Sequence, residues 1–225
     1  MSAETLVILP TFNEKDNLER VVAAVRGLGH DVRVVDDNSP DGTGELADRL
    51  AAADRQIAVL HRAGKLGLGS AYVEAFRLGL QRDHRFLVEM DADGSHRIEH
   101  LPSLIEAARV NGGLGLGSRY VAGGGVTGAG GACRKFLSWG ANVYCRALLG
   151  LNIHDCTSGY RCYPRGLLKQ IDLDRVISDG YSFQIEMVYL TTLKGFRVTE
   201  VPILFEDRIA GASKVTRGEI VGDFL

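Results

Sequence analysis

Two aspartates follow a short apolar run in the segment Val88-Glu89-Met90-Asp91-Ala92-Asp93-Gly94-Ser95-His96. The run itself, Phe86-Leu87-Val88, is typical of a buried strand. Ligands of open α/β sheets bind beyond the carboxyl ends of the strands, so Asp91 and Asp93 are expected at the mouth of a crevice. In an extended chain, residues i and i+2 point the same way, and this aims both carboxylates at one place.

Two like charges held this close are unfavourable unless a cation lies between them or one of them takes up a proton. A hard ion such as Mg²⁺ or Mn²⁺ uses oxygen ligands, commonly one or two carboxylates together with substrate phosphates. The alternative is a solvated Asp-x-Asp turn, and that interpretation is favoured when these residues are considered alone. The rest of the chain decides between the two.

Apolar runs alternate with amphipathic segments through the first half of the chain. Strands are expected at 6–9, 32–35, 57–60 and 86–88, and helices at 16–27, 43–52, 70–82 and 101–110. This alternation predicts an α/β fold with a mostly parallel, doubly wound sheet. The glycine-rich segment 64–69 lacks the order of a P-loop and is interpreted as the turn that starts a helix.

Composition narrows the class of protein. A length of 225 residues fits one domain, and a formal net charge of -2 argues against a general nucleic-acid partner. The four cysteines form no C-x-x-C pair, so reduced thiols are expected. No apolar run approaches the ~20 residues that span a bilayer, and the first residues lack the pattern of a signal peptide.

Several segments, in order along the chain, resemble the signatures of family 2 glycosyltransferases with the GT-A fold. They are residues 10–14, 35–43 and 90–96. The resemblance sharpens to the polyprenol-phosphate (dolichol-phosphate) mannose synthase group through residues 117–120, 157–161 and 213–214. Each motif alone is weak, but five or six in the same order over nearly the whole chain are strong.

The resemblance implies a single GT-A catalytic domain over 1–225, with a nucleotide-sugar-binding half (1–118) and an acceptor-side extension (119–225). It implies a metal-dependent, inverting transfer of mannose from GDP-mannose to a polyprenyl or dolichyl monophosphate. A UDP-glucose-dependent polyprenyl-phosphate glucosyltransferase is the alternative enzyme. A non-catalytic module that binds a nucleotide sugar or an anion is the alternative from another class.

The resemblance also implies which residues meet the nucleotide sugar. They are Pro10, Phe12, Glu14, Val35, Asp37, Asp91, Ala92, Asp93, Arg208 and Lys214. Phe12 offers an apolar surface, and Glu14 and Asp37 can accept hydrogen bonds from hydroxyl or N–H groups. Helix capping and turn formation are the alternative roles for these two acids.

The resemblance likewise implies which residues bind the metal and the acceptor phosphate. The expected metal ligands for Mg²⁺ or Mn²⁺ are Asp91, Asp93 and Ser95. His96 is expected either to support these ligands without binding the ion or to be structural, because a hard ion prefers oxygen. The expected acceptor-phosphate residues are Arg119, Arg134 and Ser138. Asp91, Asp93 and Arg119 form the expected catalytic set. Asp155 is expected to organise the site or to meet sugar hydroxyls.

Two segments of the acceptor-side half carry open alternatives. The glycine-rich segment 121–131 is expected to form no regular element, and it is either a lid or a flexible connection. The apolar helix expected at 134–151 has cations near both ends and fits either the core or, as we favour, a membrane interface. A peripheral place at the cytoplasmic face of a membrane follows, and the resemblance leaves room for a small membrane-anchoring subunit.

Overall fold

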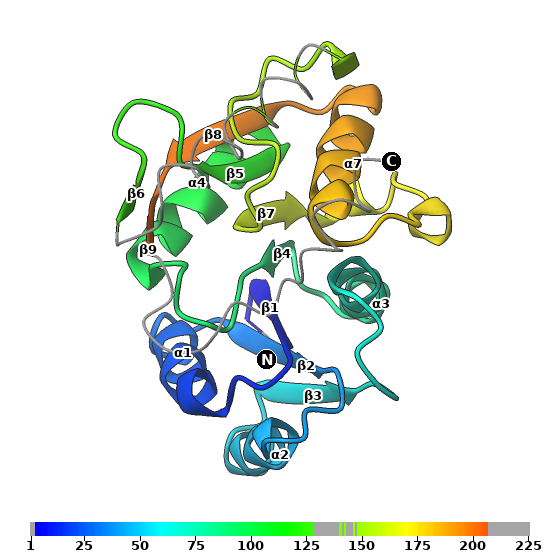
Figure 1. Cartoon of the computed structure of the whole chain (residues 1–225). Helices are drawn as coiled ribbons and strands as arrows, with labels where there is room; N and C mark the ends of the chain where they lie inside the picture. The colour runs from blue at the N-terminus through cyan, green and yellow to red at the C-terminus, as the bar shows by residue number, and fades with distance from the viewer. Residues whose placement is uncertain (1–2, 128–139, 141, 143–145, 147, 207–225) are drawn as a thin grey trace.

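A seven-stranded sheet forms the centre of the computed structural model, which describes residues 3–127, 140, 142, 146 and 148–206 (Figure 1). The strand order is β3-β2-β1-β4-β7-β5-β8. The strands are β1 (Thr5–Thr11), β2 (Asp31–Asp36), β3 (Ile57–His61), β4 (Phe86–Glu89), β5 (Leu114–Ser118), β7 (Arg161–Pro164) and β8 (Val198–Pro202).

All neighbouring strands of this sheet pair in parallel except at β7, which is antiparallel to both β4 and β5. The first four strands predicted from the apolar runs are therefore confirmed, as is the mostly parallel sheet. These strand directions bring five chain segments to the same edge of the sheet. They are the carboxyl ends of β1, β2, β4 and β5 and the beginning of β7.

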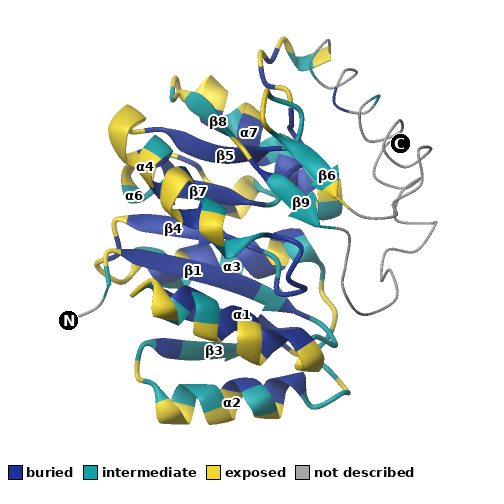
Figure 2. Ribbon diagram, turned by 90° about the vertical axis from the view of Figure 1, so that its left-hand side faces the viewer, coloured by how far each residue is buried: buried dark blue, intermediate teal, exposed yellow. Residues whose placement is uncertain are grey.

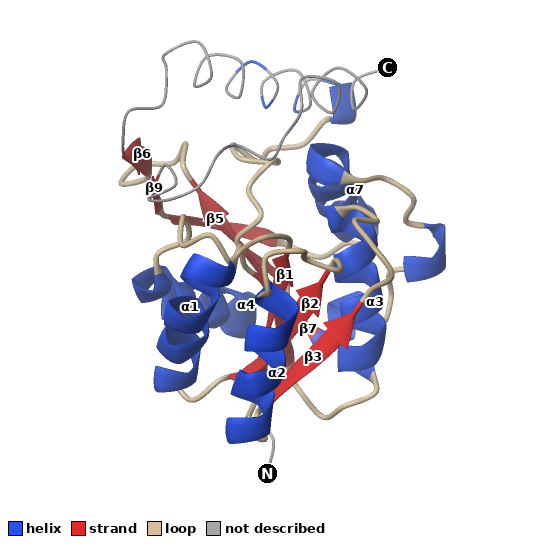
Figure 3. Cartoon of the chain, turned by 60° about the horizontal axis from the view of Figure 1, so that its bottom comes forward, coloured by secondary structure: helices blue, strands red, loops and turns tan. Residues whose placement is uncertain are grey.

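Helices cover both faces of the sheet (Figures 1 and 3). One face carries α1 (Lys15–Gly27), α2 (Thr43–Ala53) and α4 (Leu101–Asn111), and the other carries α3 (Leu68–Leu80), α6 (Arg165–Leu168) and α7 (Gly180–Leu193). Two short 3-10 turns, Ile98–His100 and Leu173–Arg175, lie in the connections. The four helices predicted in the first half are confirmed, with ends displaced by no more than two residues.

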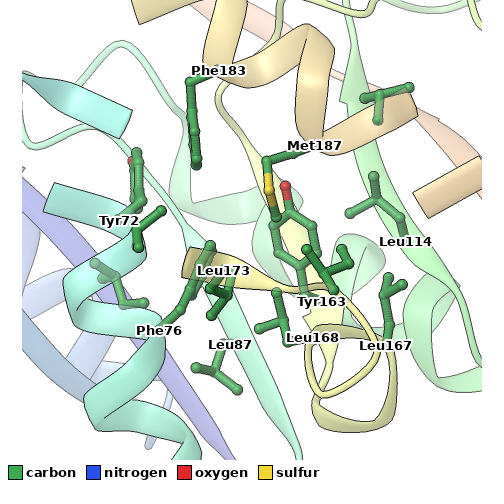
Figure 4. Close-up of a cluster of buried hydrophobic side chains, with 14 of the residues drawn as sticks. Tyr72, Phe76, Leu87, Leu114, Tyr163, Leu167, Leu168, Leu173, Phe183 and Met187 are labelled. Carbon is green, nitrogen blue, oxygen red and sulfur yellow. The ribbon is translucent and has the colours of Figure 1, made fainter. Parts of the chain in front are cut away.

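Aromatic packing joins α3 to α7 on the second face. Tyr72 stacks on Phe76 at 6.1 Å and on Phe183 at 5.9 Å between ring centroids. Tyr163 of β7 meets Phe76 edge-on at 5.3 Å. Figure 4 shows these rings with Met187 inside the buried cluster. The packing fixes α7, which lies late in the sequence, against a helix of the first half.

A second, two-stranded sheet corrects one expectation. β6 (Gly125–Thr127) pairs in parallel with β9 (Leu204–Glu206), although the segment 121–131 was expected to form no regular element. Strand pairing uses backbone groups, so glycine does not prevent it when a partner strand lies alongside. After β8 ends at Pro202 the chain resumes as β9, and β8 occupies the sheet edge, where proline is tolerated.

Burial follows this layering. The central strands are buried along most of their length, while the β6–β9 pair is only partly buried (Figure 2). Within the residues that the structure describes, every helix is too short or too polar to cross a membrane.

Candidate active site

The expected site residues gather where four parallel strands end. Phe12 and Glu14 follow β1, and Asp37 follows β2. The two aspartates Asp91 and Asp93 follow β4, and Arg119 follows β5. The strands β2, β1 and β4 are neighbours, and only β7 separates β4 from β5. Residues more than a hundred positions apart in the sequence therefore share one edge of the sheet. The two aspartates lie beyond the carboxyl end of β4, as expected, and a crevice at this place stays a prediction.

A tight turn holds Asp93 in place. Its Oδ1 accepts hydrogen bonds from the Ser95 backbone N–H at 2.9 Å and from the Ser95 hydroxyl at 2.6 Å. Asp93 is 6% exposed and Ser95 is 1% exposed. Ser95 therefore orients the carboxylate. Its hydroxyl proton is committed to Asp93, but its oxygen lone pairs remain chemically able to meet a cation.

His96 is a structural residue of this turn, as expected. Its Nδ1 accepts a hydrogen bond from the Asp91 backbone N–H at 3.0 Å, so the ring proton resides on Nε2, which lies 3.7 Å from Asp91 Oδ2. The ring stacks on Tyr160 at 4.7 Å and meets Phe205 edge-on at 5.6 Å. Burial lowers the pKa of His96 to about 4, although Asp93 opposes this shift. A neutral imidazole thus supports the loop that carries both aspartates.

Arg119 is held by a buried carboxylate. Its Nε and Nη2 donate to the two oxygens of Asp155 at 2.8 and 2.7 Å, and Nη2 also donates to the Thr157 hydroxyl at 2.8 Å. Asp155 is completely buried, whereas 13% of the Arg119 side chain remains exposed. Burial alone would lower the pKa of Arg119, but the hydrogen bonds from Arg119 to Asp155 and their charge attraction raise it above its ordinary value. The organising role expected for Asp155 is what these contacts show.

The Nη1 edge of the Arg119 guanidinium can still bind a ligand. Among the described residues, none accepts a hydrogen bond from Arg119 Nη1. The ring of Tyr120 and the ring of Phe205 flank the guanidinium at 5.4 and 5.6 Å. A fixed planar cation with one open edge suits an anion such as a phosphate.

Asp37 fixes the loop that follows β3. Its Oδ1 accepts from Arg62 Nη1 at 2.7 Å and its Oδ2 accepts from the Leu66 backbone N–H at 3.1 Å. Burial raises the pKa of Asp37, and the charge of Arg62 opposes the rise. The loop-forming alternative is therefore realised. Contact of Asp37 with a nucleotide stays a prediction, because each carboxylate oxygen can accept more than one hydrogen bond.

The other residues expected around the base and ribose differ in their exposure and in their contacts. Phe12 is partly exposed and Lys65 lies over its ring at 5.6 Å. Glu14 begins α1, and its side chain accepts from Asn17 Nδ2 at 3.0 Å. Pro10 is partly buried beside Val35 in the β1–β2 register. Val35 and Ala92 are buried in the core, and contact of either residue with a ligand stays a prediction.

Four expected site residues lie outside the described residues. They are Arg134, Ser138, Arg208 and Lys214. Most of the apolar helix expected at 134–151 lies outside them as well. Their assignment to the acceptor phosphate and to the diphosphate stays a prediction.

A hard divalent cation fits the residues present. The loop after β4 offers oxygen ligands only, from Asp91, Asp93 and Ser95. The His96 imidazole instead accepts a hydrogen bond from the Asp91 backbone N–H. The part of the chain that the structure describes holds no group of three or more His, Cys, Asp or Glu arranged around one ion. With so few protein ligands, the ion would take the rest of its coordination sphere from phosphate oxygens and water.

Some site residues carried no sequence signal. Arg62 is an isolated arginine between β3 and the glycine-rich loop, and nothing in its neighbourhood distinguishes it from a surface cation. Its partner Asp37 lies 25 residues earlier, so only the fold joins them. Thr157 lies within a motif that carries the family resemblance, but its contact with Arg119 spans 38 residues.

Comparisons with known proteins agree with this geometry. An undecaprenyl-phosphate mannosyltransferase of Micrococcus luteus is 49% identical over 97% of this chain and 89% of that protein. A polyprenol monophosphomannose synthase of Mycolicibacterium smegmatis is 50% identical over 96% of this chain and 82% of that protein.

The fold has solved counterparts. Glucosyl-3-phosphoglycerate synthase of Mycobacterium tuberculosis, crystallised with Mn²⁺ and UDP-glucose, superposes with a TM-score of 0.64 at 18% identity, over 97% of this chain and 74% of that one. A second crystal structure of that enzyme, with Mn²⁺, UDP-glucose and glycerol 3-phosphate, gives 0.63 at 17% identity over 97% of this chain and 74% of that one. The GT-A fold is thereby shown. The model of glycosyl transferase family 2 matches residues 6–172, and the chain belongs to that family.

Proposed function

We propose that this glycosyltransferase moves mannose from GDP-mannose to a polyprenyl (dolichyl-type) monophosphate, with inversion at the anomeric carbon. The products are polyprenyl phosphate mannose and GDP. Two relatives at about half identity over nearly the whole chain carry names of this activity. The observation that carries the proposal within the molecule is the pairing of an Asp-x-Asp turn with a fixed arginine at one sheet edge.

The donor occupies the crevice beyond β1, β2 and β4. Phe12 supplies an apolar surface for the base, while Glu14 and Asp37 are placed to accept hydrogen bonds from base or ribose. Asp91, Asp93 and Ser95 would hold Mg²⁺ or Mn²⁺ against the diphosphate, with Arg208 and Lys214 adding positive charge. Bound there, the ion supplies charge neutralisation for the departing GDP.

The acceptor phosphate approaches from the β5 side. Arg119 presents its open Nη1 edge, and Arg134 and Ser138 complete the proposed phosphate site. A phosphate monoester has a second pKa of ~6, so the acceptor is ionised near neutrality and needs no strong general base. One phosphate oxygen forms the bond to the anomeric carbon while the bond from that carbon to the GDP oxygen breaks, and GDP leaves with the electron pair.

Rate enhancement then comes from positioning and from charge stabilisation. The sugar passes through an oxocarbenium-like state, as in glycoside cleavage. Asp155 keeps Arg119 from turning away, so the nucleophile is held in line without reorganisation during the reaction. The acceptor carries a long apolar chain, and we place the enzyme as a peripheral protein at the cytoplasmic face of a membrane, with room for a small membrane-anchoring partner.

One assay tests the proposal. Purified protein is incubated with labelled GDP-mannose, decaprenyl or dolichyl phosphate, and Mg²⁺ or Mn²⁺, and the organic phase is counted. We expect label in the lipid fraction, and we expect EDTA to abolish it. UDP-glucose with the same acceptors is the comparison. Transfer of glucose rather than mannose would favour the alternative enzyme, and tight GDP binding without transfer of either sugar would favour a binding module.

A further inference from the structure

A set of buried polar atoms lies unpaired beside the Asp-x-Asp turn. The side chains are Tyr72 of α3, Glu89 of β4 and Gln184 of α7, and each is at most 2% exposed. Within the described residues, the Tyr72 hydroxyl, both Glu89 carboxylate oxygens and both amide atoms of Gln184 lack a hydrogen bond of good geometry. Gln184 and Tyr163 nevertheless lie near enough to Glu89 to oppose the rise that burial causes in its pKa. A buried polar group without a partner is unfavourable, so such groups usually meet water or a ligand.

Gln184 is the member of this set that reaches the active site. A Cβ added to Gly159 would lie 3.6 Å from Gln184 Nε2, 3.8 Å from Asp91 Oδ1 and 3.9 Å from His96 Cε1. An amide, a carboxylate and an imidazole therefore converge on the bare Cα of one glycine. All three distances are ordinary contact distances, so these three groups surround the position directly in front of the Gly159 Cα.

The backbone of Gln184 is fixed from several sides. Its carbonyl accepts a hydrogen bond from Arg161 Nη1 at 2.7 Å. The preceding residue, Phe183, stacks in near-parallel fashion on Tyr72, with 6° between the ring planes (Figure 4). At the beginning of α7, Asp179 accepts a hydrogen bond from the Gly69 backbone N–H at 2.7 Å. An amide carried on so rigid an element is preorganised for a ligand.

The chemistry of the amide points to one kind of ligand. An amide group carries both donors and an acceptor, and a sugar hydroxyl also donates and accepts. The reacting sugar must lie beside Asp91, between the diphosphate and the acceptor. A buried amide near that carboxylate matches a single hydroxyl of a hexose better than a phosphate, because a phosphate is bound most strongly by a cation.

We propose that Gln184 binds one hydroxyl of the transferred hexose in the space bounded by Gly159 and Asp91, and that it helps to select the donor sugar. This assignment rests on the proposed function and names a residue of its donor site. A site built to hydrogen-bond a hydroxyl discriminates against an analogue that lacks it, because the protein group is then left unpaired.

The first experiment compares Gln184→Met, which keeps the length of the side chain and removes its hydrogen bonds, with the same substitution at exposed Gln170. We expect Gln184→Met to lower kcat/KM for GDP-mannose by about 10- to 100-fold, the loss of one hydrogen bond to a buried partner. GDP carries no hexose, so its Kd should stay within about twofold. Gln170→Met should leave both quantities unchanged.

Monodeoxy analogues of GDP-mannose make the test specific. Wild type should use one of these analogues far more poorly than the others, and this penalty should disappear in Gln184→Met. A merely structural role would slow every donor alike and leave the pattern among analogues intact. The proposal is overturned if kcat/KM of Gln184→Met stays within twofold of wild type, or if the pattern among analogues persists.

Gly159→Ala is the second variant and guards against a folding defect at Gln184. The added methyl would contact Gln184 Nε2 and Asp91 Oδ1 and hinder a hydroxyl that approaches the amide, so donor use should fall while the thermal midpoint and the Kd of GDP stay near wild type. Gly166→Ala, with no atom near the added Cβ, is its control. Equal donor use by Gly159→Ala and Gly166→Ala would overturn the proposal.

Failure of the proposed function gives a different result. If wild type uses UDP-glucose instead, the donor assignment is wrong, and deoxyglucose analogues test Gln184 in the same way. If wild type transfers neither sugar, the Kd values of GDP-mannose and GDP are compared in wild type and Gln184→Met. A sugar contribution to binding that is lost in the variant supports the role of Gln184, and the absence of any such contribution overturns it.

Discussion

Arg119 combines two demands that are hard to meet in one residue, because it must be fixed and yet keep an edge open to an anion. The buried carboxylate of Asp155 meets the first demand through two parallel hydrogen bonds. Since Asp155 has no exposed surface, the pair is desolvated, and each charge depends on the other. In the proposed mechanism, Arg119 therefore links stability and catalysis at one place.

Asp155→Asn should accordingly destabilise the protein. Removing one partner of a buried ion pair leaves the other charge uncompensated, and we expect the free energy of unfolding to fall by about 3 kcal/mol. Urea unfolding measures it. Asp174→Asn is the control, because its carboxylate is 83% exposed in its pair with Arg77 and should contribute less than about 1 kcal/mol. Equal effects of the two substitutions would contradict the buried-pair argument.

Asp93 should matter for turnover far more than for stability. Asp93→Ala removes the carboxylate expected to hold the metal, and we expect kcat to fall on the order of a hundredfold or more, as for loss of a key electrostatic group. Steady-state transfer at saturating metal and acceptor measures it. Near-normal turnover under those conditions would show that Asp93 does not hold the ion. Ser95→Ala, which keeps the carboxylate, should cost much less.

Asp91 and Asp93 could be placed from the sequence because a short strand and an alternating pair of acids are local features. The pairs Asp37–Arg62 and Arg119–Asp155 could not, since 25 and 36 residues separate their members and only the sheet order brings them together. His96 was correctly assigned a structural role from ligand chemistry alone. Its stacking on Tyr160, 64 positions later, was beyond sequence reasoning.

At the scale of elements, the beginning of α3 shows why glycine occurs in the segment 64–69. The Asp179 carboxylate accepts from the Gly69 N–H, so this helix start binds an acid of the same chain. A Cβ at Gly69 would lie 2.4 Å from the Ser178 carbonyl oxygen. The glycines thus permit close approach of α3 to the segment that leads into α7, rather than forming a phosphate cradle.

Gly69→Ala should therefore be destabilising although alanine favours helices. The added methyl meets backbone that must shift, and overpacking of this kind costs about 1–3 kcal/mol. Gly64→Ala is the matched control in the same segment, because no atom lies near its added Cβ. Thermal unfolding of both variants measures the difference. A Gly69→Ala protein as stable as Gly64→Ala would show that the contact relaxes at no cost.

The beginnings of α1 and α2 share one acid, and this gives a pH dependence. Asp41 accepts from the Thr43 N–H and hydroxyl and from the Lys15 N–H. Burial would raise the pKa of Asp41, but these hydrogen bonds together outweigh it and lower the pKa below its usual 3.8. A lowered folded-state pKa means that the stabilisation is complete above pH 3.8 and is lost as the pH falls through the folded-state value.

Asp41→Asn should consequently unfold more readily at pH 7, by about 0.3–1 kcal/mol, the usual contribution of a negative charge near a helix N-terminus. The difference from wild type should shrink as the pH falls below 3.8, because wild type then loses its charge as well. Urea unfolding at pH 7 and at several values below 4 measures it. A difference independent of pH would mean that the charge of Asp41 contributes nothing.

Elements with their own hydrophobic periodicity could be predicted from the sequence, and those that depend on a partner could not. The strands β1 to β4 have apolar runs of their own. β6 has none, since Gly125–Thr127 becomes a strand only by pairing with β9. The break between β8 and β9 follows Pro202, whose missing N–H was visible, but the change of sheet partner after it was not.

At the scale of the whole molecule, the site is assembled from segments that span the chain. In the proposed site, the nucleotide side comes from the ends of β1 and β2 and from the Asp-x-Asp turn, while Arg119 follows β5 and Gln184 lies in α7. The isolated bridge between His96 and Phe205 ties the Asp-x-Asp turn to β9 near the end of the described chain. A ligand that contacts several of these segments should stabilise the fold as a whole.

Thermal unfolding with GDP and Mn²⁺ tests that expectation. A ligand at a hundred times its Kd contributes about 2.7 kcal/mol to folding, and for a domain of this size each kcal/mol shifts the midpoint by roughly 2–4 °C. We therefore expect GDP with Mn²⁺ to raise the midpoint by roughly 5–10 °C.

EDTA should remove most of this rise, because the diphosphate and the two aspartates are both anionic and repel one another without a cation between them. UDP at the same concentration should stabilise less if the base pocket is built for guanine. A rise with GDP that is unchanged by EDTA would locate diphosphate binding away from Asp91 and Asp93. Equal rises with GDP and UDP would remove the argument for a guanine nucleotide, while the metal argument would stand on the EDTA result alone.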